Sequence, residues 1–275
     1  MDFSKETYVS QSKGVLCRNF VVSPYVIDPH FKVINLPKLK THGQMIYTGA
    51  IKNIFGCVPG IKKKEAHLEM FSADNFAKMI VDLYSLVNPP FTIMDAIVAM
   101  EGNGPRSGNP RNLGFIIAGE DSLAIDSICA RIIGLDPLSI PILRYAAEFG
   151  IGNIDIKNII TYGDDWRSYC VKDFKNYSNI ESLSLLPPPV VRIMKKYLIN
   201  KPAIDYKKCI LCKKCIEACP LHEKAIYMKN NRINYDYKQC IRCFCCQEIC
   251  PEGAIYIKET LPWKILSKIY KLIKG

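Results

Sequence analysis

The sequence lacks any apolar run approaching the roughly 20 residues that a membrane-spanning helix needs. Its polar start, MDFSKETYVSQSKG, has no apolar segment of the kind that forms a secretory signal. Histidine is scarce, and His30, His67 and His222 have no metal-like spacing. Charged residues make up 23%, an ordinary globular share, which argues against wholesale disorder. We therefore expect a globular cytoplasmic protein with reduced thiols.

The composition indicates one sizeable core and a preference for anionic partners. The chain has 275 residues, of which 49% are hydrophobic, which is enough for one main domain and a small appended one. The net charge of +11 favours acidic proteins, phosphorylated or carboxylated small molecules, nucleic acid or anionic lipid. No aromatic interleaving or nucleic-acid motif accompanies the run Lys62-Lys63-Lys64, so we do not expect nucleic-acid binding.

Cysteine is abundant and clustered, with nine of the 13 cysteines falling in residues 209–250. They form the pattern C-x2-C-x2-C-x3-C-P twice, 31 residues apart, and each run is followed by an Ala-Ile-Tyr strand. Four thiolates at this spacing can hold an iron–sulfur cubane, whereas zinc ribbons use two C-x2-C pairs without a final Cys-Pro. We therefore expect two clusters in a duplicated domain, which resembles the bacterial two-cluster ferredoxins.

The spacing also suggests which thiolates share a cluster. Three cysteines wrap three corners of a cube, and in two-cluster ferredoxins the fourth cysteine ligates the other cluster. Cys245 is out of phase and corresponds to Lys214 of the first run, so we expect it not to be a ligand. The expected ligands are Cys209, Cys212, Cys215 and Cys250 for cluster I, and Cys240, Cys243, Cys246 and Cys219 for cluster II.

The rest of the chain shows alternating strand and helix patterns. Such alternation predicts an α/β domain with a mainly parallel sheet, beside the small α+β ferredoxin-like domain. The expected strands are 31–36, 91–100, 113–119 and 159–163, the first three being buried, and the expected helices are 75–87, 121–133 and 141–149. The expected domains are 1–180 (α/β), 181–203 (a linker with a short basic helix), 204–258 (ferredoxin-like) and 259–275 (a basic amphipathic helix).

Four segments carry a resemblance to a known family. KLKTH, KNIFG, EGNGP and the pair Asp121 and Asp126 occur in the order found in the family called domain of unknown function 362, which is often fused to a two-cluster ferredoxin domain. The resemblance covers about residues 31–165, and the chain lacks an N-terminal strand–helix–strand region that the comparison implies. We expect that a second chain supplies this region, that the domain is a shortened variant, or that the coding sequence is truncated.

Basic side chains in these segments suggest an anion site. Lys38 and Lys40 alternate along an extended segment and therefore point the same way, and His42 continues that side. Lys52 and Asn53 precede an expected turn at Gly56, and such groups can bind carboxylate or phosphate. The alternative is a solvated basic edge that discourages aggregation.

The loop 101–114 is rich in glycine and proline and joins two expected strands. Loops at the carboxyl ends of parallel strands bind ligands in α/β proteins, so Arg106 and Arg111 are expected to contact an anion. The alternative is a long surface connection.

Three aspartates have less certain roles. Asp121 stands where a helix starts and is expected to cap it. Asp126 lies five residues on, about 140° around the axis, so a paired acid–base site is weak; it could instead hold Lys38 or Lys52. Asp95 in a hydrophobic strand is either functional or the partner of a buried lysine.

These features predict an iron–sulfur electron-transfer protein. It is expected to be an oxidoreductase that passes low-potential electrons to an anionic substrate or cofactor, a flavin among the possibilities, bound in the α/β domain. The alternative is a non-catalytic carrier or adaptor subunit, and a redox partner protein is expected in either case. The C-terminal segment 259–275 could lie on an anionic membrane surface or dock on protein.

Overall fold

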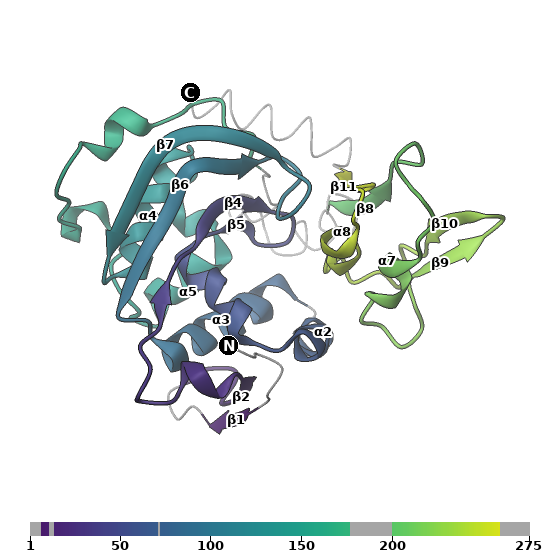
Figure 1. Cartoon of the computed structure of the whole chain (residues 1–275), viewed down its shortest axis with the longest axis horizontal. Coiled ribbons are helices and arrows are strands. Elements are labelled where there is room, and N and C mark those ends of the chain that lie inside the picture. The colour runs from purple at the N-terminus through teal and green to yellow at the C-terminus, as the bar shows by residue number, and fades with distance from the viewer. Residues whose placement is uncertain (1–6, 11–13, 71, 177–199, 259–275) are drawn as a thin grey trace, which may run out of the picture. The chain divides into compact units, whose positions relative to one another are not determined.

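The computed structural model describes residues 7–10, 14–70, 72–176 and 200–258 (Figure 1). It divides into two compact units, Met1–Asn176 and Tyr177–Gly275. The expected linker helix within 181–203 and the expected helix 259–275 fall largely or wholly outside the described residues. Among the helices of the described residues, none is long and apolar enough to cross a bilayer.

The first unit contains a mixed sheet built around one long strand, β6 (Phe91–Glu101). β3 (Ile34–Asn35) and β4 (Lys38–His42) both pair with it in parallel, one after the other along the same side of β6. β7 (Asn109–Gly119) lies antiparallel to β6, and β5 (Ile46–Thr48) lies antiparallel to β4. The expected α/β class, with parallel strands at the centre of the sheet, is confirmed.

Helices cover one face of this sheet. α3 (Ala73–Val87) begins where the Ser72 side chain accepts a hydrogen bond from the Asn75 N–H, and it ends at left-handed Asn88. α4 (Ser122–Ile132) begins at Asp121, whose carboxylate accepts from the Ala124 N–H as expected. Figure 1 shows α4 behind strands β6 and β7. The other helices are α1 (Ala50–Asn53), α2 (Gly60–Glu69) and α5 (Pro141–Glu148).

The expectation of three buried strands is wrong in part. β3 has only two residues, and its Ile34 is 58% exposed. The strands β6 and β7 are buried on one face only. Ile97 and Ile116 are 50% and 58% exposed, whereas Met94 is fully buried. Their antiparallel pairing explains the pattern, because an antiparallel sheet can leave one face in water. The loop between them is also shorter than expected, because residues 109–114 belong to β7.

The expected strand at 159–163 is wrong. This segment is without regular strand structure, and it lies between two short 3₁₀ turns instead. Ile160 and Tyr162 are 79% and 92% exposed, and only Ile159 of this segment packs against the core. The 3₁₀ turns of the unit are η1 (Pro24–Val26), η2 (Ile54–Cys57), η3 (Pro137–Ser139), η4 (Ile156–Asn158) and η5 (Trp166–Tyr169).

The N-terminal region forms a hairpin of β1 (Thr7–Ser10) and β2 (Asn19–Val22), for which the sequence has only a weak hydrophobic pattern. The Asp82 carboxylate of α3 holds the chain between the two strands. It accepts hydrogen bonds from the N–H groups of Val15, Leu16 and Cys17 at 2.7–2.8 Å. A buried carboxylate with three donors therefore ties this hairpin to the main core.

The second unit is a duplication with exchanged strands. Each half has the order strand, cysteine loop, short helix, strand, and each half pairs with the other. β8 (Lys201–Ile204) pairs with β11 (Ile255–Lys258), and β9 (Ile226–Lys229) pairs with β10 (Arg232–Tyr235). The helices α7 (Lys214–Glu217) and α8 (Cys245–Ile249) each carry the third cysteine of their run.

Candidate functional site

The cysteines expected to hold cluster I line one cavity of the second unit. This cavity is otherwise lined mainly by apolar residues, including Leu211, Ile233 and Ile255. The first run supplies three thiols, and Cys250 arrives from the end of the second run. The chain thus brings together Cys209, Cys212, Cys215 and Cys250.

The thiols of the second set also lie near one another. Burial is the main cause that raises the pKa of Cys240, and the neighbouring Cys243 and Cys219 raise it further. Cys219 and Cys246 belong to one buried cluster against which Cys240 packs, as the exchange of the fourth ligand requires. Burial also raises the pKa of Cys246, whose sulfur accepts a hydrogen bond from the Tyr235 hydroxyl at 3.4 Å.

Left-handed residues shape each cysteine loop. Leu211 and Lys213 have φ values of 56° and 61°, and the corresponding residues of the second loop, Arg242 and Phe244, have 58° and 61°. The repeated turn brings three thiols to one side without glycine, a strain that ligand loops can hold. A backbone donor also points at sulfur, because the Ala254 N–H donates to Cys250 Sγ at 3.3 Å. These loops, with amide and hydroxyl donors to sulfur, fit cubane clusters, whose charge such donors stabilise.

Cys245 differs from the expected ligands in its contacts. Its thiol donates a hydrogen bond to Cys243, and this bond lowers the pKa of Cys243. The same contact raises the pKa of Cys245, so the proton stays on Cys245. The assignment of Cys245 as a non-ligand stays a prediction. Its thiol donates to Cys243, one of the expected ligands of cluster II.

In the first unit, two of the family segments meet at the carboxyl ends of β4 and β6. The Thr41 hydroxyl donates to the Gly102 carbonyl at 2.8 Å, and a Cβ on Gly104 would lie 2.1 Å from the Thr41 carbonyl oxygen. Only glycine therefore allows this loop to lie against β4. Lys40 and His42 flank Thr41 in β4, and Arg106 follows Gly104 by two residues in the loop.

His42 has a structural role at this edge. It is buried, and its Nδ1 accepts hydrogen bonds from the N–H groups of Gln44 and Met45 at 3.1 and 3.2 Å. These bonds shape the turn between β4 and β5, and they place the proton of the neutral ring on Nε2.

Two other basic candidates are held by carboxylates. Lys38 Nζ lies 2.7 Å from Asp95 Oδ2, and both side chains are about half exposed. The pKa of Asp95 is lowered chiefly by its hydrogen bond from Lys38. Asp95 thus has a lysine partner, but a solvent-accessible one rather than the buried one expected. Arg111 pairs with Asp173 rather than facing an open anion site.

Asp126 is fully buried under the sheet and holds the segment that precedes α1. It accepts hydrogen bonds from the Tyr47 hydroxyl and from the N–H groups of Ala50 and Ile51 at 2.7–3.0 Å. Burial is the main cause that raises the pKa of Asp126, to about 6, and the three donors lower it. Its observed donors are a tyrosine and two amides, whereas the sequence suggested Lys38 or Lys52.

Asn53 is exposed, and it forms the outer end of a polar chain of buried residues that the sequence did not reveal. Its side-chain amide donates to Asn35 at 2.9 Å, and Asn35 in turn donates to the Ala50 carbonyl at 2.9 Å. Asn35 also reaches Thr92, whose hydroxyl lies 2.7 Å from that of Ser122. This chain joins the KNIFG segment to β3, β6 and α4, so Asn53 positions the segment.

Comparison with known proteins agrees with both halves of this description. Residues 1–131 match the family described as "Domain of unknown function (DUF362)", and residues 201–251 match the "4Fe-4S dicluster domain". The chain joins a DUF362 domain to a 4Fe-4S dicluster domain. The first match begins at residue 1, so it includes thirty residues that lay outside the expected resemblance.

One curated relative is the "Thylakoid-associated protein sll1697" of Synechocystis sp., which is 42% identical over 120 residues. The alignment covers 43% of this chain and 37% of the relative, so it spans well under half of either protein. No solved structure matches this chain. The dicluster domain binds [4Fe–4S] clusters, and iron–sulfur electron transfer is the activity that it supports.

Proposed function

We propose that this protein passes low-potential electrons from two [4Fe–4S] clusters to an acceptor bound by the DUF362 domain. The observation that carries the proposal is the meeting of Cys209, Cys212 and Cys215 with Cys250 at one apolar cavity. When bound, the clusters supply one-electron steps at low potential. The chain supplies thiolates, and it supplies donors such as the Tyr235 hydroxyl and the Ala254 N–H that tune the potential.

Anaerobic reconstitution of the full chain tests the clusters. We expect about eight irons and eight sulfides per chain, two cubanes' worth. Reduction by dithionite should give the paramagnetic signal of reduced [4Fe–4S] clusters. Zinc in place of iron, or one cluster's worth of iron, would contradict the proposal.

The proposed acceptor is anionic and binds at the carboxyl ends of β4 and β6, near Lys40, His42 and the loop of Arg106. Ligands of α/β proteins bind at such strand ends, and the net charge of +11 favours an anion. Lys52 is a further candidate contact. The flavin mononucleotide FMN is a suitable probe, and riboflavin is its matched control without phosphate.

The Arg106→Gln and Arg167→Gln variants test this site. Arg106 lies in the proposed loop, whereas Arg167 is a solvent-accessible arginine paired with Asp165 elsewhere on the unit. We expect Arg106→Gln to weaken FMN binding by tenfold or more and Arg167→Gln to leave it unchanged. Equal binding of FMN and riboflavin would overturn the phosphate contact.

A non-catalytic carrier or adaptor subunit is the second candidate. It is favoured by the internal contacts of Lys38, Asp95 and Arg111, which form ion pairs instead of an open site. Here the DUF362 domain would dock a redox partner or a second chain that completes the domain. Native mass spectrometry of anaerobically purified material separates the two candidates, because a retained small molecule favours the enzyme and a second polypeptide favours the subunit.

We propose a peripheral association with membranes as the location. The relative from Synechocystis is described as thylakoid-associated, and the segment 259–275 combines apolar residues with lysines. Co-sedimentation with anionic vesicles should be lost when the chain is ended after Lys258, and retention by the shortened chain would contradict the role of this segment.

A further inference from the structure

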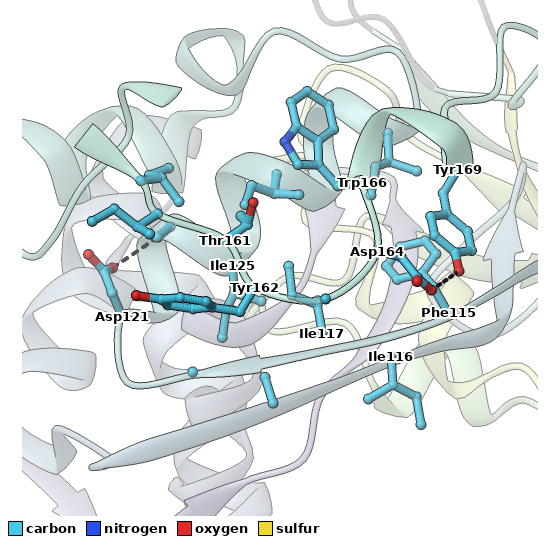
Figure 2. A pocket seen from close by; sticks show the side chains of 18 of the residues that line it. Phe115, Ile116, Ile117, Asp121, Ile125, Thr161, Tyr162, Asp164, Trp166 and Tyr169 are labelled. Atoms are coloured by element: carbon cyan, nitrogen blue, oxygen red, sulfur yellow. Dashed lines mark hydrogen bonds between the residues drawn. The ribbon is translucent and has the colours of Figure 1, made fainter. Parts of the chain in front are cut away.

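A cavity of about 690 Å³ lies in the first unit between β7, α4 and the segment 159–169 (Figure 2). Its volume falls within the range of about 300–1,000 Å³ that is common for small-molecule sites. The cavity exists because the segment 159–169 runs past β7 without pairing with it as a strand.

Two walls of the cavity are apolar. Phe115 and Ile117 line it from β7, and Ile125 and Ile128 line it from α4. Figure 2 shows Ile117 pointing from the strand toward the segment that carries Thr161 and Trp166. Gly119 lies on the same face of β7, since side chains on one face recur every second residue.

The third wall is aromatic. Trp166, Tyr162 and Tyr169 come from the segment 159–169, and the ring of Tyr169 lies 5.5 Å from that of Phe115. Tyr162 is 92% exposed, so its ring lies at the rim and not in the core. Aromatic side chains in this arrangement can make stacked and edge-to-face contacts with a flat ring of a bound molecule.

The charge of the lining argues against an anion. Among the described residues that line the cavity, three are acidic and none is lysine or arginine. Asp164 accepts a hydrogen bond from the Tyr169 hydroxyl at 2.9 Å, and Asp121 accepts from Ala124 and Asn153. Neither aspartate has a cationic partner in these bonds. Carboxylates at a partly apolar site repel a second negative charge more strongly than they would in water.

We propose that this cavity binds a flat, largely apolar ring compound that is uncharged or cationic. The site is distinct from the anion site proposed at the carboxyl ends of β4 and β6. The inference depends on neither the clusters nor the electron-transfer function, because it rests on the lining alone.

Three probes with one ring system and different charges test the proposal. They are 2-naphthalenemethanol (uncharged), 2-naphthylmethylammonium (cationic) and naphthalene-2-sulfonate (anionic). Equilibrium dialysis against the cluster-loaded full chain should show binding of the first two and at least tenfold weaker binding of the sulfonate. Equal or tighter binding of the sulfonate would overturn the charge assignment, and no binding of any probe would overturn the site.

A cavity-filling variant locates the binding. A Cβ added at Gly119 would lie 3.8 Å from Ile125 Cδ1, an ordinary contact, so Gly119→Leu should fold and occupy the cavity. The control is Asn112→Leu, an exposed position on the same strand outside the lining. We expect Gly119→Leu to reduce binding of the uncharged probe at least tenfold and Asn112→Leu to leave it unchanged.

A second filling variant guards against misfolding of the first. Ala124→Phe enters the same cavity from α4, where Ala124 is only partly buried. Undiminished binding by a folded filling variant, or an equal loss in Asn112→Leu, would place the probe elsewhere and overturn the proposal.

Discussion

The Tyr47 hydroxyl donates a hydrogen bond of 2.9 Å to the Asp126 carboxylate, and both side chains are buried. The same carboxylate accepts from two N–H groups at the start of α1. An aspartate from the second half of the family pattern thus anchors the segment that leads to KNIFG. These three contacts join residues 75–79 positions apart in the chain, which explains why both regions occur in one set of motifs.

The raised pKa of Asp126, about 6 against an ordinary 3.8, makes the unit less stable as the pH rises. The folded state binds this proton more tightly than the unfolded chain does. The contribution of Asp126 to the free energy of unfolding is therefore complete below about pH 4 and disappears as the pH rises from about 4 to 6. The loss amounts to about 3 kcal/mol for a group acting alone. Urea unfolding of the full chain, followed by signals of the first unit, should show this fall.

The matched variants are Asp126→Asn and Asp121→Asn. Asp126→Asn removes the titrating group, so the pH-dependent fall should flatten, although the amide cannot accept from all three donors and lowers stability overall. Asp121→Asn should keep the fall. A fall that persists in Asp126→Asn would assign it to another group.

Asp82 should hold the N-terminal hairpin in place. Asp82→Ala leaves three N–H donors, those of Val15, Leu16 and Cys17, without their acceptor, at a cost of about 1–3 kcal/mol for each donor that stays buried. Limited proteolysis should then cut residues 14–18 at least tenfold faster. Asp74→Ala, on the same helix but paired with Arg144, serves as the control and should leave this site resistant.

Cys215→Ser should remove one cluster and spare the first unit. Iron content should fall from about eight to about four, one cubane's worth. The control Cys170→Ser changes an exposed cysteine of the first unit and should keep all the iron. Loss of the thermal unfolding transition of residues 14–176 in Cys215→Ser would show that the two units do not fold separately.

Cys245→Ser should leave the iron content unchanged. A serine hydroxyl can still donate to Cys243, so the main effect should be a modest shift in the potential of one cluster. Cyclic voltammetry of the anaerobic variant measures that shift. A loss of about four irons would make Cys245 a ligand and would change the assigned register.

Local spacing made the cysteine loops and several helices predictable from the sequence. The helix around 75–87 follows from its apolar periodicity, and Ser72 starts it by capping. Asp121 was predictable as a cap for the same local reason. Such features depend on neighbours within one or two turns, which the sequence displays directly.

Long-range contacts account for what the sequence did not reveal. The role of Asp82 in holding the hairpin could not be predicted, because its hydrogen-bond donors lie 65–67 positions away in the chain. The apolar pattern of 159–163 suggested a strand, yet the segment runs beside a cavity without pairing with the sheet, and Ile160 is exposed. The candidates Lys38 and Arg111 looked like anion contacts because their acidic partners come from other elements.

The antiparallel pairing of β8 with β11 sets Lys201 opposite Lys258, so the iron–sulfur module starts and finishes at one point. Because its two ends lie close together, such a module can be inserted into a surface loop of another protein without moving the residues on either side of the insertion point. It can also be circularly permuted, with its old ends joined and new ends opened at the Asn230–Asn231 turn, where both residues have left-handed backbones.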